Sequence, residues 1–423
     1  MWHNEYCLTE PSGGAKTLKI RRQSHFYSKN IPPHCPVVDF SQLPDWKGPD
    51  LKLPAPGYDA GLSDFFLIDL DQETAVFQYD VLGFCFWMMT RQEEKEAHLL
   101  DEHDRFLSIH SHAHEHNYLH RPIVDEWFEV LGVALQKLMG NLRLTEPVFK
   151  MLPSHDVDTP ASYQFMPVET VGRSVLSSLL KQGDMVEAWR CLYQRFSNSS
   201  QLHASDKVNT FDWIVSLSDR NNLVSAFYFV CGRTSDTFDP AYSISSRPMV
   251  SLLKSVSASG HEIGLHPSYH CYKNEQLIRS ELNNLKSICA ANGLSDACSG
   301  VRMHYLRWAP ETLSLLDKAG FTYDTTLGYA DRAGFRCGTC FEFPGFDSET
   351  NKIMNIRVRP LIAMEVSVFS EKYMGLDAAE GADVLRALKG KCRAVGGQFT
   401  LLWHNDRLAS NPMREIYRNV IQC

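Results

Sequence analysis

The stretch that decides the fold is Gly260-His261-Glu262-Ile263-Gly264-Leu265-His266-Pro267-Ser268-Tyr269-His270. Side chains alternate between two faces from His261 to His266, which predicts a strand that ends at His266. Pro267 cannot continue the strand pairing but suits the first turn of a helix. Such a turn would put His266 and His270 on one face, four residues apart. Two imidazoles, one carboxylate and an open water position are typical of a catalytic zinc site. The stretch therefore predicts a metal centre whose carboxylate comes from elsewhere in the chain.

Length and charge limit the classes of protein to consider. A chain of 423 residues predicts two domains, or one barrel with an extension. The formal net charge of −8 and the pI near 6.1 argue against a surface for nucleic acid or anionic membrane. No apolar run is long enough for a membrane-spanning helix. The 12 cysteines are scattered and no apolar leader is visible, so we expect reduced thiols and a cytoplasmic location.

From residue 148 onward, strand patterns alternate with helix patterns. We predict about seven strands, mostly joined by helices, at 148–152, 225–230, 261–266, 301–305, 322–327, 356–364 and 399–404. This order favours a parallel (β/α) barrel. Residues 1–145 are predicted to form a smaller N-terminal α/β domain of unknown role, and residues 146–423 the barrel.

Ionisable residues follow almost every predicted strand. In a (β/α) barrel, functional side chains gather just past the carboxyl ends of the strands. In this chain those positions fall in the segments 154–158, 266–270, 302–308, 324–326, 331–332 and 401–406. A purely structural barrel has no reason to place charges there, so we expect a functional site at this end.

Residues 149–423 resemble the NodB-homology polysaccharide deacetylases, which are carbohydrate esterase family 4. Asp156-Val157-Asp158 is similar to a variant of the first family motif. His266–His270 is similar to the second, with Pro267 where serine or threonine is usual. The segments 91–94 and 121–127 resemble an uncharacterised N-terminal extension found in a bacterial branch of the family.

The later motifs follow in the family's order. Arg302-Met303-His304-Tyr305 resembles the third motif, with His304 in place of proline, and Leu402-Trp403-His404 resembles the fifth. The fourth, an Asp–Trp pair, is the least clear. Asp331 is near the right place without a following tryptophan, and Asp324 competes with it.

The resemblance implies a deformed (β/α)7 barrel with a divalent metal, by default zinc. Asp158, His266 and His270 would hold the metal, in agreement with the two-histidine, one-carboxylate pattern. Asp156, two residues before Asp158, would face the same pocket and act as the base that deprotonates the attacking water. Taken alone, the two aspartates also fit a turn-capping pair.

Roles for the other motif residues also follow from the resemblance. Arg302 would hold Asp156 as a fixed cation, although a purely structural ion pair remains open. The backbone N–H of Tyr305 would face the oxyanion. His404 would protonate the leaving amine, with Asp331 or Asp324 raising its pKa. As an isolated residue, His404 would instead read as a hydrogen-bonded core histidine.

The predicted reaction is hydrolysis of the acetamide of an N-acetylated sugar. Its substrate would be nucleotide-linked, lipid-linked or an oligosaccharide, as a precursor of a surface polysaccharide. Trp308 and Trp403 are open between sugar contacts and core residues. Two other functions stay open: hydrolysis of a different amide, such as a sugar carboxamide, and a non-catalytic role in glycan binding or assembly.

Overall fold

In a computed structural model, the structure describes residues 5–9, 16–27, 32, 34–40, 52–58, 66–69, 74–95, 98–140, 142–181, 184–294, 298–347 and 349–422. The chain divides into two compact units. The first comprises 1–150 with 333–342 and 387–399, and the second comprises 151–332, 343–386 and 400–423. The first unit thus takes in two segments from late in the sequence, and the division at 145/146 stays a prediction.

The first unit contains a four-stranded sheet in the order β1-β2-β6-β5 and a separate hairpin of β3 and β4. Strands β2 and β6 are parallel, whereas the other pairs are antiparallel. The strands are β1 (Glu5–Thr9), β2 (Thr17–Arg21), β3 (Val37–Asp39), β4 (Lys52–Pro54), β5 (Phe66–Asp69) and β6 (Thr74–Phe77). The helices are η1 (Ser24–Tyr27), α1 (Val81–Met89), η2 (Gln92–Glu94), η3 (Ser108–His110), α2 (His112–Glu115) and α3 (Ile123–Met139).

Buried polar contacts attach the segment 333–342 to this unit. Arg336 pairs with Glu94 at 2.6 Å, and both side chains are buried. Asp125, in the first turn of α3, accepts hydrogen bonds from the hydroxyl of Thr339 and the backbone N–H of Cys340. Buried charges and acceptors need such partners to offset lost hydration. The late segment therefore belongs to the folded unit.

The second unit is built on a nine-stranded sheet in the order β12-β13-β11-β10-β9-β8-β7-β15-β14. It is parallel from β13 to β7 and between β15 and β14, while β12 is antiparallel to β13. Its strands are β7 (Lys150–Val157), β8 (Ala226–Val230), β9 (Glu262–His266), β10 (Gly300–Val301), β11 (Tyr323–Asp324), β12 (Phe343–Asp347), β13 (Lys352–Val358), β14 (Ala363–Met364) and β15 (Gln398–Leu402).

The predicted strand 356–364 is split into β13 and β14, which belong to opposite ends of the strand order. The backbone N–H of Arg359 donates to the carbonyl oxygen of Asp324 in β11. The backbone N–H of Ile362 donates instead to the carbonyl oxygen of Thr400 in β15. Pro360, which has no N–H to pair, lies at this change of partner. One bent segment thus joins the two ends of the strand order. With β13 and β14 counted as one strand and the antiparallel β12 left aside, the described part of the sheet has seven strands. This confirms the predicted deformed (β/α)7 barrel.

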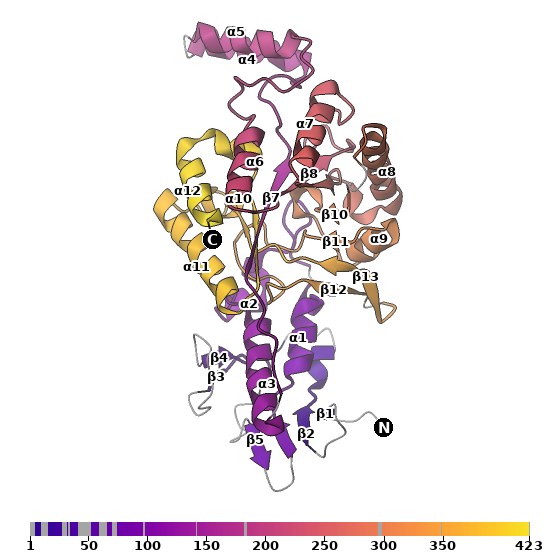
Figure 1. The fold of residues 1–423 in the computed structure, drawn as a ribbon, viewed down its shortest axis with the longest axis vertical. Helices are drawn as coiled ribbons and strands as arrows, with labels where there is room; N and C mark the ends of the chain where they lie inside the picture. The colour runs from indigo at the N-terminus through magenta and orange to yellow at the C-terminus, as the bar shows by residue number, and fades with distance from the viewer. Residues whose placement is uncertain are drawn as a thin grey trace. The chain divides into compact units, whose positions relative to one another are not determined.

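Helices lie outside these strands, with α8 and α9 on one side and α12 on the other (Figure 1). The helices from α4 onward are α4 (Val168–Lys181), α5 (Met185–Phe196), α6 (Phe211–Arg220), α7 (Arg247–Ala258), η4 (Cys271–Lys273), α8 (Glu275–Ala291), η5 (His304–Leu306), α9 (Thr312–Ala319), α10 (Glu365–Phe369), α11 (Ala378–Ala394), η6 (Asn405–Ala409) and α12 (Asn411–Ile421). Among the residues that the structure describes, none of these helices combines the length and apolar character needed to cross a bilayer.

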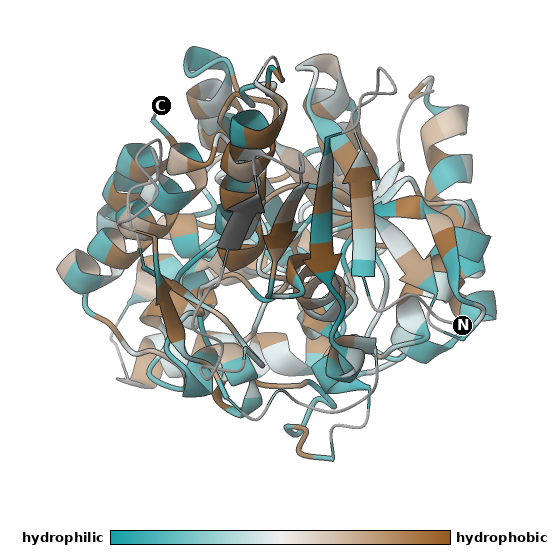
Figure 2. Cartoon of the chain, turned by 90° about the horizontal axis from the view of Figure 1, so that it is seen from below, coloured by the Kyte–Doolittle hydropathy of each residue, from teal (hydrophilic) through white to brown (hydrophobic). Residues whose placement is uncertain are grey.

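Strands are coloured largely as hydrophobic, while the helices carry many hydrophilic residues as well (Figure 2). Every residue of β8 is buried, as expected for a parallel strand covered on both faces. At Gly264 in β9, a Cβ would lie 2.5 Å from the ring of Tyr228 and 2.9 Å from the carbonyl oxygen of Gly300. Glycine at this position therefore permits the close approach of β8 and β10 to β9.

Candidate metal centre

The register of three neighbouring strands brings the predicted metal ligands to one level. Val157 at the end of β7 pairs with Phe229, and Val230 pairs with His266 at the end of β9. Asp158 is one residue beyond Val157, so it reaches the level of His266. The carboxyl ends of parallel strands meet at one end of a barrel, which we call the mouth.

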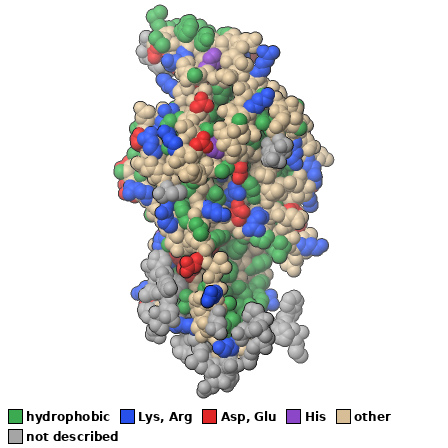
Figure 3. Space-filling model, in the orientation of Figure 1, with side chains coloured by type: hydrophobic (Ala, Val, Ile, Leu, Met, Phe, Trp, Pro, Cys, Tyr) green, Lys and Arg blue, Asp and Glu red, His purple; other side chains and the backbone are tan. Residues whose placement is uncertain are grey.

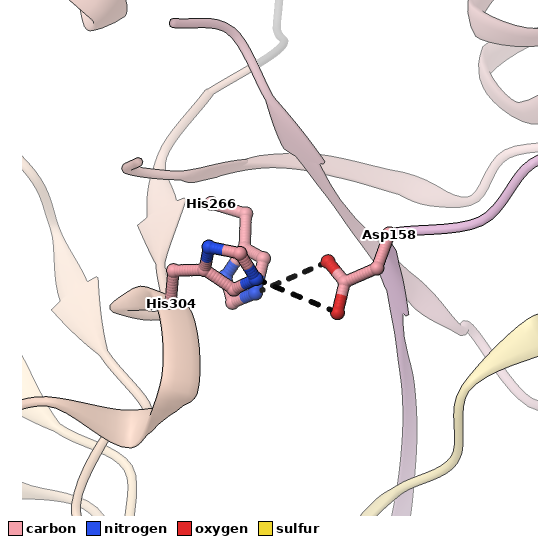
Figure 4. Close-up of side chains that lie close together, drawn as sticks. All are labelled: Asp158, His266 and His304. Carbon is pink, nitrogen blue, oxygen red and sulfur yellow. Dashed lines mark ion pairs between the residues drawn. The ribbon is translucent and has the colours of Figure 1, made fainter. Parts of the chain in front are cut away.

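Asp158, His266 and His304 form a cluster at the mouth. Each offers one ligand atom, and these atoms lie within 4.8 Å of one another. The carboxylate of Asp158 faces both imidazoles, which come from different segments (Figure 4). His266 Nε2 lies 3.6 Å from Asp158 Oδ1, and His304 Nε2 lies 3.7 Å from Asp158 Oδ2.

Hydrogen bonds at the other ring nitrogen fix how both histidines face the cluster. Nδ1 of His266 donates to the carbonyl oxygen of Arg302, and Nδ1 of His304 donates to Asp239 Oδ1 at 2.9 Å. With Nδ1 protonated, Nε2 carries the lone pair that a metal needs. An imidazole held in this way by a carbonyl or a carboxylate is the usual arrangement of a metal-ligating histidine.

Asp239 is itself held in place by the loops after β8 and β9. It accepts hydrogen bonds from the backbone N–H groups of Thr234, Ser235 and Tyr269. Burial alone would raise the pKa of Asp239, but the hydrogen bond from His304 and these N–H groups lower it to about 2. Asp239 is thus an ionised carboxylate that orients His304.

The electrostatics of the cluster favour a cation. Burial lowers the pKa of His266. Burial also opposes the charge on His304, yet Asp158 and Asp239 raise its pKa to about 9. Burial of Asp158 is likewise outweighed by the neighbouring histidines, which hold its pKa below the ordinary range. The two carboxylates that attract a proton to His304 would also favour a divalent ion that replaces this proton.

The residues present fit such an ion. Asp158 Oδ1 is buried and has no hydrogen-bond partner, although the side chain as a whole is 29% exposed. A buried carboxylate oxygen without a partner is costly unless a ligand completes it. Two imidazole nitrogens and one carboxylate oxygen form a donor set suited to zinc in an open site.

Asp156 lies beside the cluster and is fixed by Arg302. Arg302 is fully buried, and its Nη1 donates to Asp156 Oδ1 at 2.8 Å. The rest of the guanidinium donates to Ser154 Oγ and to the carbonyl oxygen of Thr325. The other oxygen of Asp156 lies 3.5 Å from His266 Nε2. One carboxylate oxygen is therefore anchored while the other faces the site.

His404, just past β15, approaches the cluster from another side. Its Nε2 lies 3.6 Å from Asp158 Oδ2, and its Nδ1 donates to Glu365 Oε1 at 2.7 Å. Burial would lower the pKa of His404, but Glu365 and then Asp158 raise it to about 10. The arrangement gives a protonated imidazole that is directed into the site.

The prediction of which carboxylate contacts His404 was wrong. Glu365, the first residue of α10, occupies the position that we predicted for Asp331 or Asp324. The buried carboxylate of Asp324 instead accepts hydrogen bonds from the backbone N–H and the hydroxyl of Thr326. Asp331 is partly buried, and its predicted role in tuning or substrate binding stays a prediction.

His270 is not part of the cluster, so the predicted ligand set needs correction. No helical turn begins at Pro267. The chain makes a turn at 269–270, and the short helix η4 begins only after His270. The backbone N–H of His270 donates to Thr234 Oγ1, and the residue is exposed. The predicted spacing therefore fails because it needed a helical turn that does not form. His304 stands in the cluster instead.

The remaining predicted residues differ in their setting. Tyr305 has a left-handed backbone, with φ at 61°, which is strained for a bulky residue and typical of functional loops. The oxyanion role of its N–H stays a prediction. Trp403 is fully buried against Phe369 and Tyr417, which argues against a sugar contact. Trp308 is partly buried, and its contact with substrate stays a prediction.

Sequence reasoning missed three residues of the site: His304 as a cluster member, Asp239 and Glu365. His304 was visible as the histidine that replaces proline in the third motif. Glu365 directly follows the predicted strand 356–364, so reading every strand end would have found it. Asp239 lies nine residues past the end of β8, where no local pattern indicates its role.

Comparison with known proteins gives two results for different parts of the chain. Residues 5–140 match a family of unknown function, DUF7033, in agreement with the uncharacterised extension expected there. No curated protein sequence matches the chain.

Solved structures similar to this chain include polysaccharide deacetylases. A putative one from Mycobacterium smegmatis shares 16% identity over 66% of this chain and 85% of its own, with a TM-score of 0.42. A probable one from Pseudomonas aeruginosa PAO1 shares 14% identity over 67% and 88%, with a TM-score of 0.37. A mutant of a CE4 family pseudoenzyme, with restored enzymatic activity, shares 9% identity over 66% and 62%, with a TM-score of 0.31. The chemistry of this chain depends on its own residues.

Proposed function

We propose that this protein is a metal-dependent hydrolase that removes the acetyl group from an N-acetylated sugar. One observation carries the proposal: three kinds of group converge on one point. The cluster of Asp158, His266 and His304 is flanked by Asp156 at 3.5 Å from His266 and by His404 at 3.6 Å from Asp158. Amide hydrolysis needs these functions together: a Lewis acid, a base and an acid.

Asp158, His266 and His304 would hold the divalent ion, by preference zinc. Such an ion supplies Lewis acidity, which lowers the pKa of water and polarises a carbonyl group. The hydrogen bonds from His266 to Arg302 and from His304 to Asp239 keep both Nε2 atoms facing Asp158. These second partners orient the ligands before anything binds.

Asp156 is our candidate for the general base. The anchored oxygen accepts from Arg302, so the other can take a proton from the attacking water. The hydrogen bond from the buried cation of Arg302 prevents the carboxylate from turning away. Burial of the guanidinium strengthens this contact because little water screens it.

His404 is our candidate for the general acid. An acetamide can lose its amine only if the nitrogen is protonated as the bond breaks, and His404 carries a proton on the nitrogen that faces the site. Glu365 holds the ring and favours its charged form. Base and acid thus come from different strands, β7 and β15, and the cluster lies between them.

For the substrate we retain the N-acetyl sugar expected from the motifs, as a nucleotide-linked or lipid-linked precursor of a surface polysaccharide or as an oligosaccharide. The cytoplasmic location expected from the scattered cysteines also stays a prediction. Either form of substrate places the amide on a sugar ring.

The test is acetate release by zinc-loaded protein from a panel of nucleotide-linked, lipid-linked and oligomeric N-acetyl sugars. Release of acetate that disappears in Asp156→Asn would support the proposal. Release of ammonia from sugar carboxamides instead would assign a different amide. Sugar binding without any turnover by metal-loaded protein would indicate a non-catalytic glycan protein and overturn the proposal.

A further inference from the structure

The helices α4 and α5 form a hairpin inserted between β7, which carries Asp156, and α6. Among the described elements they pack chiefly against each other, and they stand apart from the barrel strands (Figure 1). A few polar contacts secure their base, including Tyr163 to Glu187 at 2.7 Å and Arg195 to the carbonyl oxygen of Met166. The hairpin therefore projects from the barrel, and the barrel does not cover its outer faces.

The outer face of α5 is apolar along the whole helix. Met185, Trp189, Leu192 and Phe196 follow the i, i+4, i+7, i+11 spacing of one helix face and are 42–76% exposed. Residues that α5 buries include the small or polar Ala188, Cys191 and Gln194. This reverses the normal pattern of a surface helix, in which the apolar stripe faces inward.

The rest of the exposed apolar surface continues across the hairpin. Side chains of this kind gather over α4 and α5 at the upper end of the view (Figure 3). They are Val168, Leu176, Leu179 and Leu180 on α4, and Val186 and Tyr193 beside the α5 face. Trp189 and Tyr193 stack with ring centroids 4.9 Å apart. Monomeric proteins rarely expose so large a contiguous apolar patch.

The area of this patch suits a stable protein interface. At about 150–250 Å² for an aromatic side chain and roughly 100 Å² for an aliphatic one, the ten exposed fractions add to on the order of 700 Å². A stable interface buries about 800 Å² on each partner. Aromatic side chains, methionine and arginine, which this hairpin presents, are the residues enriched in such interfaces.

Charge argues against a lipid surface as the occupant. Residues 168–196 contain four basic and three acidic side chains, and the whole chain has a net charge of −8. Arg190 is also paired with Glu187. Helices that lie on anionic membranes present a strongly basic polar face, which is missing here.

We infer that the α4–α5 hairpin is a dimerisation element that pairs with the same hairpin of a second copy of this chain. An apolar face without net charge can meet its own copy across a two-fold axis, because residue i on one chain meets residue j on the other and j meets i. Two antiparallel hairpins then form a four-helix bundle, whose core is made of the outward faces described above.

The test is sedimentation velocity of the full-length protein at micromolar concentration. We expect a dimer whose dissociation constant rises at least about tenfold in Trp189→Glu and in Met185→Glu. Met185 lies at the first position of α5, where an acidic residue favours the helix, so that variant keeps the fold. The matched control is Ile353→Glu, a 73% exposed residue of β13, which should leave the dimer unchanged.

Three outcomes would overturn the inference. A wild-type chain that stays monomeric at these concentrations has no such dimer. A dimer that persists unchanged in both hairpin variants uses another surface. A monomer that floats with lipid vesicles, and loses this binding in Trp189→Glu, would assign the patch to a membrane.

Discussion

The loops after β9 and β10 each bring a histidine to the barrel mouth, but only one of the two reaches the cluster. His270, four residues past His266, is exposed, and its backbone N–H donates to Thr234 Oγ1 in the loop after β8. His304, three residues past Val301, is buried between Asp158 and the carboxylate of Asp239. The difference shows that sequence spacing alone does not identify a metal ligand. A hydrogen-bond partner at the second ring nitrogen, such as Asp239 for His304, is what orients the imidazole.

Asp156→Asn is expected to have the largest effect, because it removes the proposed general base. Arg302, in the loop after β10, positions this carboxylate. The rate of acetate release should fall by about 10²–10⁴-fold. Asparagine can still accept from Arg302, so the metal content should stay near that of wild type. Asp158→Asn should lose both metal and activity. A protein that loses its metal in Asp156→Asn would reverse the two roles.

His404→Ala should lower the rate on the natural acetamide by on the order of 10²-fold while keeping the metal. An activated acetyl ester needs less help from an acid, so its hydrolysis should fall much less. Glu365→Gln, which keeps an oxygen acceptor for His404 Nδ1, should give a smaller loss on the amide. Equal losses on amide and ester would show that His404 is structural.

Asp239→Asn tests whether the orienting carboxylate distinguishes His304 from His270. We expect zinc affinity, measured by competition with a chelating dye, to fall by about 10–100-fold. Protein concentration and pH stay the same for the control His270→Gln, whose affinity should match wild type. An unchanged affinity in Asp239→Asn would remove the reason we give for the choice of histidine.

Thr234→Val should have the smallest effect. Thr234 Oγ1 bonds to Asp239 and Ser268 and accepts the N–H of His270, so it links the two loops. Loss of the hydroxyl should lower the free energy of unfolding by about 1 kcal/mol, measured by denaturant titration. A much larger loss, accompanied by loss of metal, would mean that the loop after β9 does more than support the site.

The parts of the fold that follow from repeated patterns could be predicted from the sequence. Alternating strands and helices indicated the barrel, and the ends of β7, β9 and β15 held Asp156, Asp158, His266 and His404. Bends in the chain could not be predicted in this way. The change of strand partner near Pro360 and the left-handed backbone at Tyr305 depend on tertiary contacts.

The site was predictable in part for the same reason. His266 could be found because strand periodicity fixes where it points, whereas the position of His270 depended on a turn that tertiary contacts decide. Asp239 reaches His304 from a loop distant in sequence. Such a contact leaves no periodic signal in a single chain.

The most direct test of the account is the zinc content of His304→Ala and His270→Ala, purified and dialysed side by side with wild type and measured by elemental analysis. We predict about one zinc per chain in wild type and in His270→Ala, and almost none in His304→Ala. Zinc retained in His304→Ala and lost in His270→Ala would contradict the assignment of the metal to Asp158, His266 and His304.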